Sequence, residues 1–338
     1  MICAGHINIS LWYNCDRQNG LFPYVSLVEM FCLYGVNVFG LITGYVCAYS
    51  KLNTKRILKV IILVMFYSFI GLLVAVIWKP DFMSKDYILQ SFFPISKGVY
   101  WYVAAYIVVI VLSPLLNSFL QRIEKNGGVV TAIVLLALAL YCFLVNDVLS
   151  IGWGYNAVWL SWLYIMGGVL LIMKDKNCFP FLYRKRIKVI FILLYCFSAI
   201  MNWIAFFCGY GNAYINARTQ RYNNVFIVIG AISLFMGLHD IEINKSVINK
   251  VVLFFSSCCL SVYLIQVNPL FWNQIISEKY LYLMDESAKQ YLIHFVIHVF
   301  ATFILLSGID KVRQLLFELM KVNKLMDAIG DKLNQYIR

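Results

Sequence analysis

The sequence predicts an all-α fold, a polytopic integral membrane bundle of about ten spans with no soluble catalytic domain attached. Hydrophobic residues make up 62% of the 338 residues and charged residues only 13%, whereas soluble domains carry about 25% charged residues. The apolar residues form long runs separated by short polar clusters, and no alternating pattern typical of a membrane β-barrel is visible. Backbone groups must be hydrogen-bonded within lipid, so these runs are expected to be helices.

Nine apolar runs approach or reach the roughly 17–25 residues that a helix needs to cross the hydrocarbon core. We expect these spans at 25–49, 57–78, 99–120, 129–145, 155–173, 187–208, 224–238, 251–272 and 290–309. A further apolar piece, residues 1–13, is too short to span alone. It ends in the polar stretch 14–20, so we expect it to be the outer part of a first span whose beginning is missing.

The basic residues are distributed unevenly between alternate loops. If the first span runs outward, the inner loops and the C-terminal segment hold 20 of the 28 Lys and Arg residues, and the outer side holds eight. Cytoplasmic loops of membrane proteins carry such an excess, so we expect both termini in the cytoplasm. The same loops account for the net charge of +12. Because no base-stacking module accompanies this charge, nucleic acid is not an expected partner.

The C-terminal segment has a different pattern from the rest of the chain. In residues 310–338, apolar residues recur at helical spacing with Lys and Asp between them. This is the pattern of an amphipathic helix that lies on membrane lipid. We therefore divide the chain into a membrane domain at 1–309 and a basic, amphipathic cytoplasmic tail at 310–338. A tail helix that binds a protein partner is the alternative.

Few residues in the apolar runs can carry chemistry. The ten cysteines include no C-x-x-C pair and are expected to be small buried hydrophobes. His294 and His298 have a spacing that can hold a metal, but no carboxylate or cysteine joins them in the run, so we expect hydrogen bonds there. His6 lies in the first apolar piece, where an imidazole can accept a proton. A hydrogen-bonded structural role is the alternative for His6.

The order of several short motifs is more specific. An apolar piece with His6 precedes G-V-N-V-F-G-L-I-T-G-Y at 35–45 and the basic loop K-L-N-T-K-R at 51–56. G-V-Y-W-Y-V opens the fourth span, S-P-L-L-N lies near its end, and S-V-Y-L-I-Q-V-N-P-L-F-W occupies 261–272. This order resembles the membrane acyltransferase 3 family, which includes bacterial surface-polysaccharide O-acetyltransferases. The resemblance covers the whole chain and agrees with the span count.

The resemblance implies an enzyme of the bacterial cytoplasmic membrane. It would move an acyl group, expected to be acetyl, from a cytosolic acyl-CoA to a hydroxyl of a cell-surface glycan or lipid-linked oligosaccharide. Acetyl-CoA would be a co-substrate, and no permanently bound cofactor or metal is expected. His6 would act as the general base on the sugar hydroxyl.

The resemblance also implies two binding regions. The donor's phosphates would meet a basic cluster at the inner mouth, beside a turn that lets the backbone approach closely. The residues of this donor region are Lys55, Arg56, Lys59, Thr43, Gly44 and Tyr45. The acceptor path would be lined by Asn37, Trp101, Tyr102, Tyr263 and Gln266. The alternatives are an ordinary positive-inside loop for the cluster, helix packing for Gly44, and interfacial anchoring for the two aromatic residues of the fourth span.

Two features depart from the family pattern. Family members carry an arginine well before the histidine of the first helix, and this chain starts only five residues before His6. Either the start codon is misassigned or the chain is a truncated member; if the 338-residue form is the genuine product, we expect it to be inactive. Gln266 also stands where the family has a histidine. Other functions therefore stay open: a polysaccharide flippase, polymerase or other multispan transporter, or an inactive truncated relative. A transporter predicts internal repeats or paired broken helices, and we find no internal repeat in the sequence.

Overall fold

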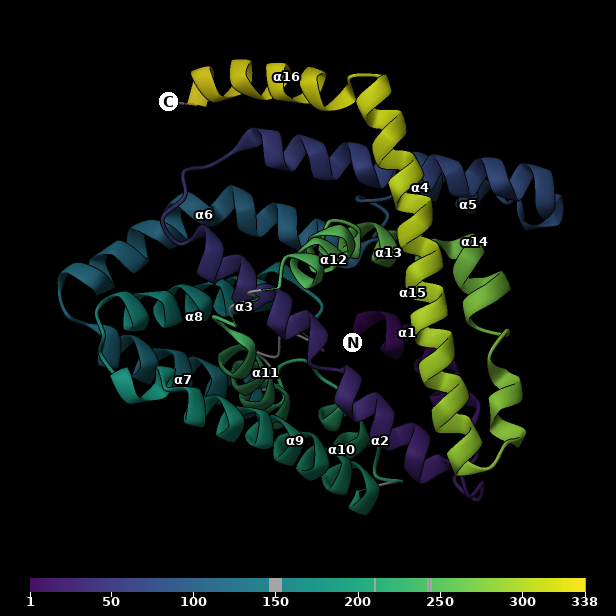
Figure 1. Ribbon diagram of the computed structural model, residues 1–338, viewed down its shortest axis with the longest axis horizontal. Helices are drawn as coiled ribbons and strands as arrows, with labels where there is room; N and C mark the ends of the chain where they lie inside the picture. Colours follow the sequence, from purple (N-terminus) through teal and green to yellow (C-terminus); the bar gives the residue numbers. More distant parts are fainter. Residues whose placement is uncertain (146–153, 210, 242, 244, 338) are drawn as a thin grey trace. The chain divides into compact units, whose positions relative to one another are not determined.

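The computed structural model describes residues 1–145, 154–209, 211–241, 243 and 245–337, and this part of the chain contains helices and no strand (Figure 1). It forms two compact units. The first unit consists of Met1, Ser26–Leu52 and Ala105–Ile241. The second unit consists of Ile2–Val25, Asn53–Ala104 and Glu242–Arg338.

The α-helices follow one another with short connections. Their bounds are α1 Ile2–Asn14, α2 Phe22–Cys32, α3 Gly35–Cys47, α4 Thr54–Trp78, α5 Lys85–Phe92, α6 Trp101–Lys125, α7 Val129–Val145, α8 Ala157–Asp175, α9 Lys185–Cys208, α10 Ala213–Thr219, α11 Val225–Leu238, α12 Ser246–Ser256, α13 Cys259–Gln266, α14 Pro269–Phe271, α15 Ala288–Leu319 and α16 Val322–Ile337. Two short 3-10 helices precede α5 and α9, and a π-helical turn at Trp272–Ile276 and a 3-10 helix at Leu281–Asp285 precede α15.

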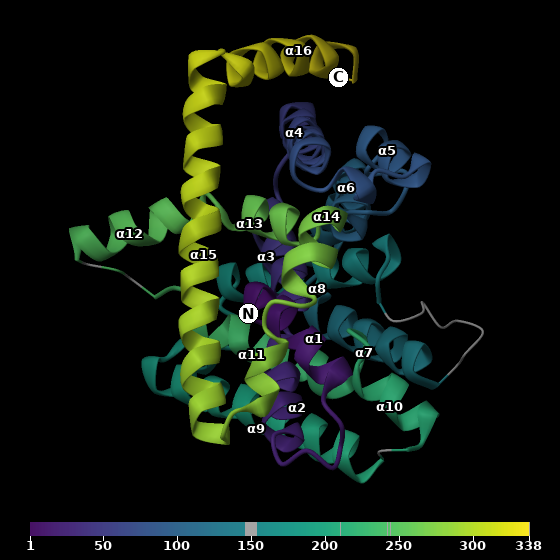
Figure 2. The same cartoon turned by 90° about the vertical axis from the view of Figure 1, so that its right-hand side faces the viewer.

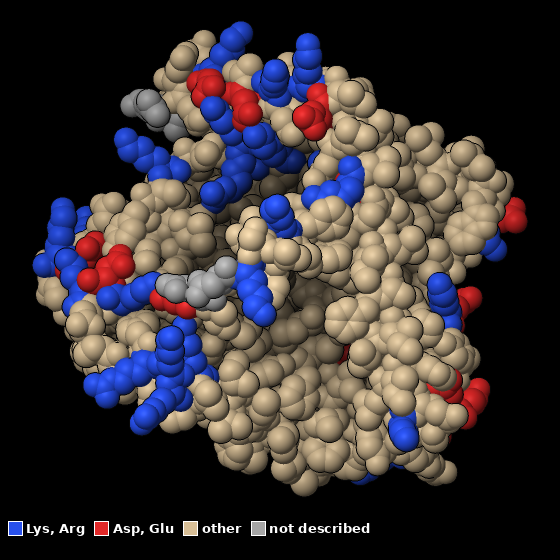
Figure 3. Space-filling view, in the orientation of Figure 1, with Lys and Arg blue, Asp and Glu red and all other residues tan. Residues whose placement is uncertain are grey.

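The helical fold class is confirmed. In the described residues, seven segments are long and apolar enough to cross a membrane by length and composition. The predicted runs at 129–145 and 224–238 form shorter apolar helices, and the first apolar piece forms α1. Much of the face in Figure 3 carries neither acidic nor basic side chains, as expected for a surface in contact with lipid. The count of ten spans and the cytoplasmic location of the termini stay predictions, as does the division of the chain at residue 310. Arg338, one of the predicted cytoplasmic cations, lies outside the described residues.

Two of the expected spans differ in detail from the helices observed. The run at 251–272 is divided into α12, α13 and α14, with a break at Ser257 and Cys258 and another before Pro269. The last expected span, 290–309, is part of α15, which continues as one helix to Leu319. At its end Lys321 has a φ of 56°, and the chain turns so that α16 runs crosswise to α15 (Figures 1 and 2).

Close contact between backbones holds the first unit together at α3 and α8. A Cβ atom added to Gly44 would lie 1.9 Å from the carbonyl oxygen of Tyr164, and one added to Gly167 would lie 2.1 Å from the carbonyl oxygen of Leu41. Each helix therefore presents a glycine to the backbone of the other. Small residues at such crossings are typical of membrane helices, where packing rather than hydrophobic exclusion drives association.

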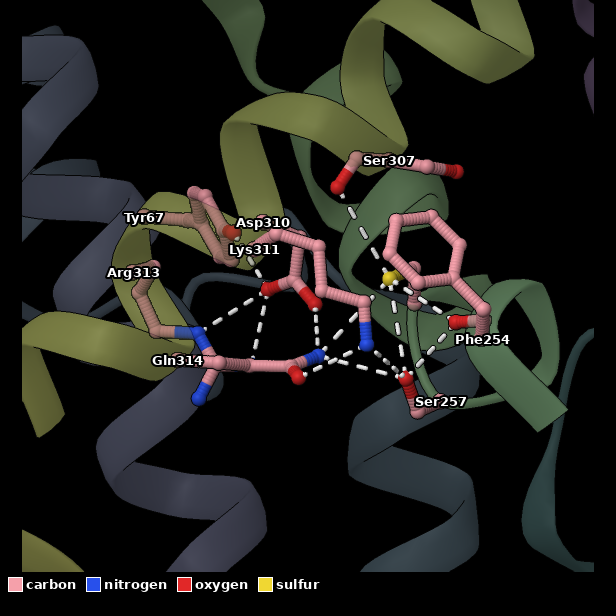
Figure 4. A network of polar contacts seen from close by, with 9 residues as sticks. Tyr67, Phe254, Ser257, Ser307, Asp310, Lys311, Arg313 and Gln314 are labelled. Atoms are coloured by element: carbon pink, nitrogen blue, oxygen red, sulfur yellow. Dashed lines mark hydrogen bonds and ion pairs between the residues drawn. The ribbon is translucent and has the colours of Figure 1, made fainter. Parts of the chain in front are cut away.

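A buried carboxylate joins two helices of the second unit, α4 and α15, and a neighbouring lysine reaches a third segment. Asp310 of α15 is fully buried. The donors to its carboxylate are Tyr67 Oη at 2.7 Å, Arg313 Nε at 2.9 Å and Gln314 Nε2 at 2.7 Å (Figure 4). Lys311 Nζ donates to Ser257 Oγ, 2.8 Å away, at the break between α12 and α13. Because an unpaired buried charge is costly, this network fixes α4 and the start of α13 against α15.

We expect Gly44→Ala to lower the free energy of unfolding by at least about 1–3 kcal/mol, the usual cost of overpacking, because the added methyl group meets backbone that cannot move aside. Gly308→Ala is the matched control, since Gly308 lies within α15 and its Cβ would meet nothing within 4 Å. The control should keep or slightly raise stability. Thermal unfolding of the purified proteins in detergent measures both. Equal melting temperatures for Gly44→Ala and the native chain would contradict this account of the α3–α8 contact.

Candidate active site

His6 of α1 lies beside the end of α13 in the second unit. Its Nδ1 atom is 3.2 Å from Oε1 of Gln266, the last residue of α13. Nε2 of the same glutamine donates to Sγ of Cys3, 3.1 Å away on α1. Cys3 in turn donates to the carbonyl oxygen of Val299 on α15. A chain of polar contacts therefore runs from α15 through α1 to the His6 ring.

The contact with Gln266 determines which nitrogen of His6 carries hydrogen. An amide oxygen has no hydrogen and can only accept, so Nδ1 must donate to Oε1. In the neutral imidazole the other nitrogen, Nε2, then has a free lone pair and acts as a hydrogen-bond or proton acceptor. Cys3 orients the amide group so that its oxygen rather than its nitrogen faces the ring. The pair thus presents Nε2 of His6 as a base.

Aromatic side chains surround the His6 ring. The ring of Trp272 meets it edge-on, with centroids 5.6 Å apart and an interplanar angle of 86°, and the Tyr263 ring lies 5.9 Å away. The ring centroid of Tyr102 lies 6.2 Å from that of Tyr263, and the ring centroid of Trp101 lies 5.7 Å from that of Tyr102. The structure therefore brings four of the five residues predicted for the acceptor path, namely Trp101, Tyr102, Tyr263 and Gln266, into one group with His6. The role predicted for them is not tested by this proximity.

Asn268, which was not among the predicted site residues, holds the chain two residues after Gln266. Its Oδ1 accepts the backbone N–H of Leu270 at 3.1 Å and caps α14. Its Nδ2 lies 3.4 Å from the Tyr67 carbonyl oxygen and 3.5 Å from the Tyr100 hydroxyl, against Gly71, where a Cβ would come within 2.3 Å of it. The Asn-Pro pair at 268–269 is a turn signal that could have indicated this capping role.

A second asparagine holds α1 in place. Asn8 is fully buried, and its Nδ2 donates to the carbonyl oxygen of Val25 at 2.9 Å. Its Oδ1 accepts from the hydroxyl of Tyr291 on α15 at 2.6 Å. These bonds fix the rotation of α1 two residues after His6. The pairing of Asn8 with Tyr291 was not predicted, because a buried Asn in an apolar run carries no signal of its partner.

The basic cluster of the predicted donor region lies in the first turns of α4. Asn53 caps this helix by accepting the backbone N–H of Lys55. Lys55 and Lys59 are one helical turn apart, so their side chains share a face. Both lysines are paired, which no local sequence pattern indicates: Lys55 Nζ lies 2.7 Å from Asp331 and Lys59 Nζ lies 2.7 Å from Asp327, both on α16.

The remaining predicted site residues lie in the first unit. Thr43 donates to the carbonyl oxygen of Phe39 in its own helix, and Gly44 packs on α8 as described above. The buried Asn37 donates to the Tyr222 carbonyl oxygen at 2.7 Å and accepts from the indole N–H of Trp159 at 3.0 Å. Helix packing therefore accounts for the placement of Gly44, and a closed set of hydrogen bonds accounts for Asn37. Their predicted roles toward donor and acceptor stay predictions.

Tyr45 contacts a histidine that the sequence analysis did not connect with it. Its hydroxyl lies 2.7 Å from Nε2 of His239, which follows α11. Burial lowers the pKa of His239 below its usual value, and the carboxylate of Asp240, 3.2 Å from the ring, offsets only part of the shift. Burial therefore favours the neutral form of His239, which can share a hydrogen bond with the tyrosine.

The two histidines of the last span make hydrogen bonds instead of facing a common ligand. His294 Nδ1 lies 2.7 Å from a carboxylate oxygen of Glu286, and His298 Nε2 contacts the Tyr282 hydroxyl. Their partners lie in the segment just before α15. This arrangement agrees with the hydrogen-bonding role expected for the pair.

Comparison with known proteins identifies the family. Residues 1–310 match the family model described as an acyltransferase domain. No curated protein and no solved structure gives a match. The family match includes α1 with His6, the basic cluster of α4 and the end of α13, and it covers far more than half of the 338 residues. The chain therefore belongs to the membrane acyltransferase 3 family.

Proposed function

We propose that the protein transfers an acetyl group from acetyl-CoA to a hydroxyl of a cell-surface or lipid-linked polysaccharide, in the bacterial cytoplasmic membrane, with His6 as general base. Family membership gives the acyltransferase activity in general. The observation that carries the finer proposal is the bond from His6 Nδ1 to Gln266 Oε1. It leaves Nε2 with the lone pair that a general base needs.

The reaction then has a simple balance of atoms. The lone pair of His6 Nε2 takes the proton of the sugar hydroxyl while the hydroxyl oxygen attacks the thioester carbonyl carbon. A new C–O bond forms, the C–S bond breaks, and the electron pair of that bond leaves on the sulfur of CoA. The imidazolium returns its proton to this thiolate. The products are the acetyl ester and CoA, and His6 is neutral again for the next cycle.

The surroundings of His6 support a sugar as the acceptor. Tyr102, Tyr263 and Trp272 form an aromatic group next to the base. Tyrosine and tryptophan combine a large apolar ring with a polar end. Such rings pack against the C–H faces of a sugar, while their polar ends can meet its hydroxyl groups. In this proposal Tyr263 and Trp272 hold the sugar ring, and the hydroxyl to be acylated faces Nε2 of His6.

The basic cluster of α4 supports an anionic thioester as the donor. Lys55, Arg56 and Lys59 lie within one and a half turns of the helix start. Phosphate groups of CoA carry several negative charges, and an arginine can bind two phosphate oxygens at once. In this proposal the cluster binds the nucleotide end of the donor. The thioester end extends toward the base.

In the full-length protein, with an intact first helix, we expect His6→Ala to reduce acetyl transfer by roughly 10²–10⁴-fold, the usual contribution of a positioned general base. Gln266→Leu should cause a smaller loss, because it keeps the base but removes the acceptor that selects the Nδ1–H tautomer. The measurement is mass spectrometry of the surface glycan from cells that contain only the variant. Membrane insertion is checked separately by the amount of folded protein in the membrane fraction.

The control for this experiment is His294→Ala, which removes a histidine of α15 that bonds to Glu286. It should leave the acetyl content of the glycan unchanged. A normal acetyl content in the His6→Ala strain would remove His6 from the mechanism.

We expect Arg56→Ala to raise the Kd for acetyl-CoA by roughly ten- to a hundredfold, since a hydrogen bond to a charged group contributes about 1.5–3 kcal/mol. Isothermal titration of the purified protein with acetyl-CoA measures this change. Arg122→Ala near the end of α6 is the control, because it removes an exposed cation outside the cluster. Unchanged affinity in Arg56→Ala, with normal expression, would show that the cluster only orients the chain in the membrane.

A further inference from the structure

The tail helix α16 lies along the start of α4, where the basic cluster is (Figures 1 and 2). Two ion pairs join the helices: Lys55 with Asp331 and Lys59 with Asp327, each at 2.7 Å. The two lysines are four residues apart and so are the two aspartates. Two antiparallel helices with this spacing match one carboxylate to each ammonium group. Acidic and basic side chains accordingly intermingle over α16 at the top of Figure 3.

Three further contacts show that the match is specific. The Thr54 hydroxyl donates to the Gly330 carbonyl oxygen at 2.9 Å, and the Thr54 backbone N–H donates to Oδ1 of Asn334 at 3.3 Å. A Cβ atom added to Gly330 would lie 2.5 Å from Cγ of Lys55 and 3.0 Å from its Cα. Any side chain at position 330 would therefore push α16 away from α4. The tail is docked on the cluster by shape as well as by charge.

Both ion pairs are nevertheless partly exposed to solvent, which weakens them. The exposed fractions are 30% for the Lys55 side chain, 60% for Asp331, 42% for Lys59 and 41% for Asp327. Exposed pairs contribute little to stability and are screened by salt. The helix is also connected to α15 only through Met320 and Lys321, the latter in the left-handed region. A ligand with several negative charges can therefore replace the two carboxylates without disturbing α15.

We propose that α16 covers the donor cluster and competes with the donor for it. Asp331 and Asp327 form ion pairs with Lys55 and Lys59, and the phosphates of the donor must displace the two aspartates. This proposal rests on the assignment of the cluster to the donor in the proposed function. It predicts that the tail lowers the affinity for CoA. It also predicts that any molecule that binds α16 and draws it away from α4 raises the affinity for the donor.

The first test measures the Kd for coenzyme A with the full chain in detergent or nanodiscs. The double variant Asp327→Asn/Asp331→Asn removes the competing charges, and Gly330→Leu detaches α16 without changing any charge. Both should lower the Kd by about three- to tenfold, the range expected when two exposed ion pairs no longer compete.

The controls for these variants are Glu278→Gln/Asp285→Asn, which removes two exposed charges outside α16, and Ala328→Leu, which adds bulk on the exposed side of α16. Both controls should bind coenzyme A like the native chain.

The second test measures the cover itself and does not depend on donor binding. An amine-reactive reagent followed by mass spectrometry gives the labelling rates of Lys55 and Lys59. These rates should rise several-fold in Gly330→Leu and in the double aspartate variant, and should stay unchanged in both controls. Unchanged labelling in the detached variants would overturn the cover.

The two tests also separate this inference from the proposed function. Faster labelling with unchanged or weaker binding of coenzyme A would overturn the competition, although the tail covers the lysines. If neither the native chain nor any variant binds coenzyme A at millimolar concentration, the donor assignment fails and the competition fails with it. Faster labelling together with tighter binding is the result that both proposals expect.

Discussion

An amide oxygen has no hydrogen to donate, and this constraint governs how His6 can act. Because Oε1 of Gln266 faces Nδ1 of the imidazole, the ring keeps its hydrogen on that side and exposes the Nε2 lone pair. Three side chains of the second unit keep the His6 and Gln266 side chains in this position. Cys3 fixes the amide from α1, Asn268 fixes the chain after α13, and Asn8 ties α1 to α15. The base is thus positioned by side chains that cannot themselves take up its proton at neutral pH.

The apolar environment explains why the buried carboxylate that supports α13 accepts several hydrogen bonds. Inside lipid an unpaired polar group costs several kcal/mol, so polar side chains in such spans are expected to meet each other or the backbone. The carboxylate of Asp310 accepts from three side chains, and Lys311 reaches the helix break at Ser257 (Figure 4). This network fixes the start of α13, while Asn268 fixes its other end. The short helix that carries Tyr263 and Gln266 is therefore held on both sides.

The sequence predicted the helices well because long apolar runs have few alternatives in a membrane. Through the family resemblance it assigned His6, Tyr102 and Tyr263 to one reaction; the structure places their rings near one another, and the assigned roles stay predictions. The break at Ser257 could not be predicted, since neither Gly nor Pro marks it. The pairing of Asp327 and Asp331 with α4 could not be predicted either, because acidic residues alternating with Lys on an amphipathic helix suggest solvent exposure. The direction of the bond between His6 and Gln266 depends on the third residue, Cys3, and no local pattern contains that information.

The tautomer of His6 tests the central claim most directly. Nitrogen-15 chemical shifts of the histidine rings, measured with labelled full-length protein in nanodiscs and assigned with a His6→Asn variant, distinguish the two ring nitrogens among the four histidines. The structure predicts that Nδ1 of His6 carries the hydrogen and that Nε2 does not. It also predicts that Gln266→Leu removes this preference while the other three histidines keep their shifts. A native ring protonated on Nε2 with a bare Nδ1 would contradict the arrangement on which the proposed base depends.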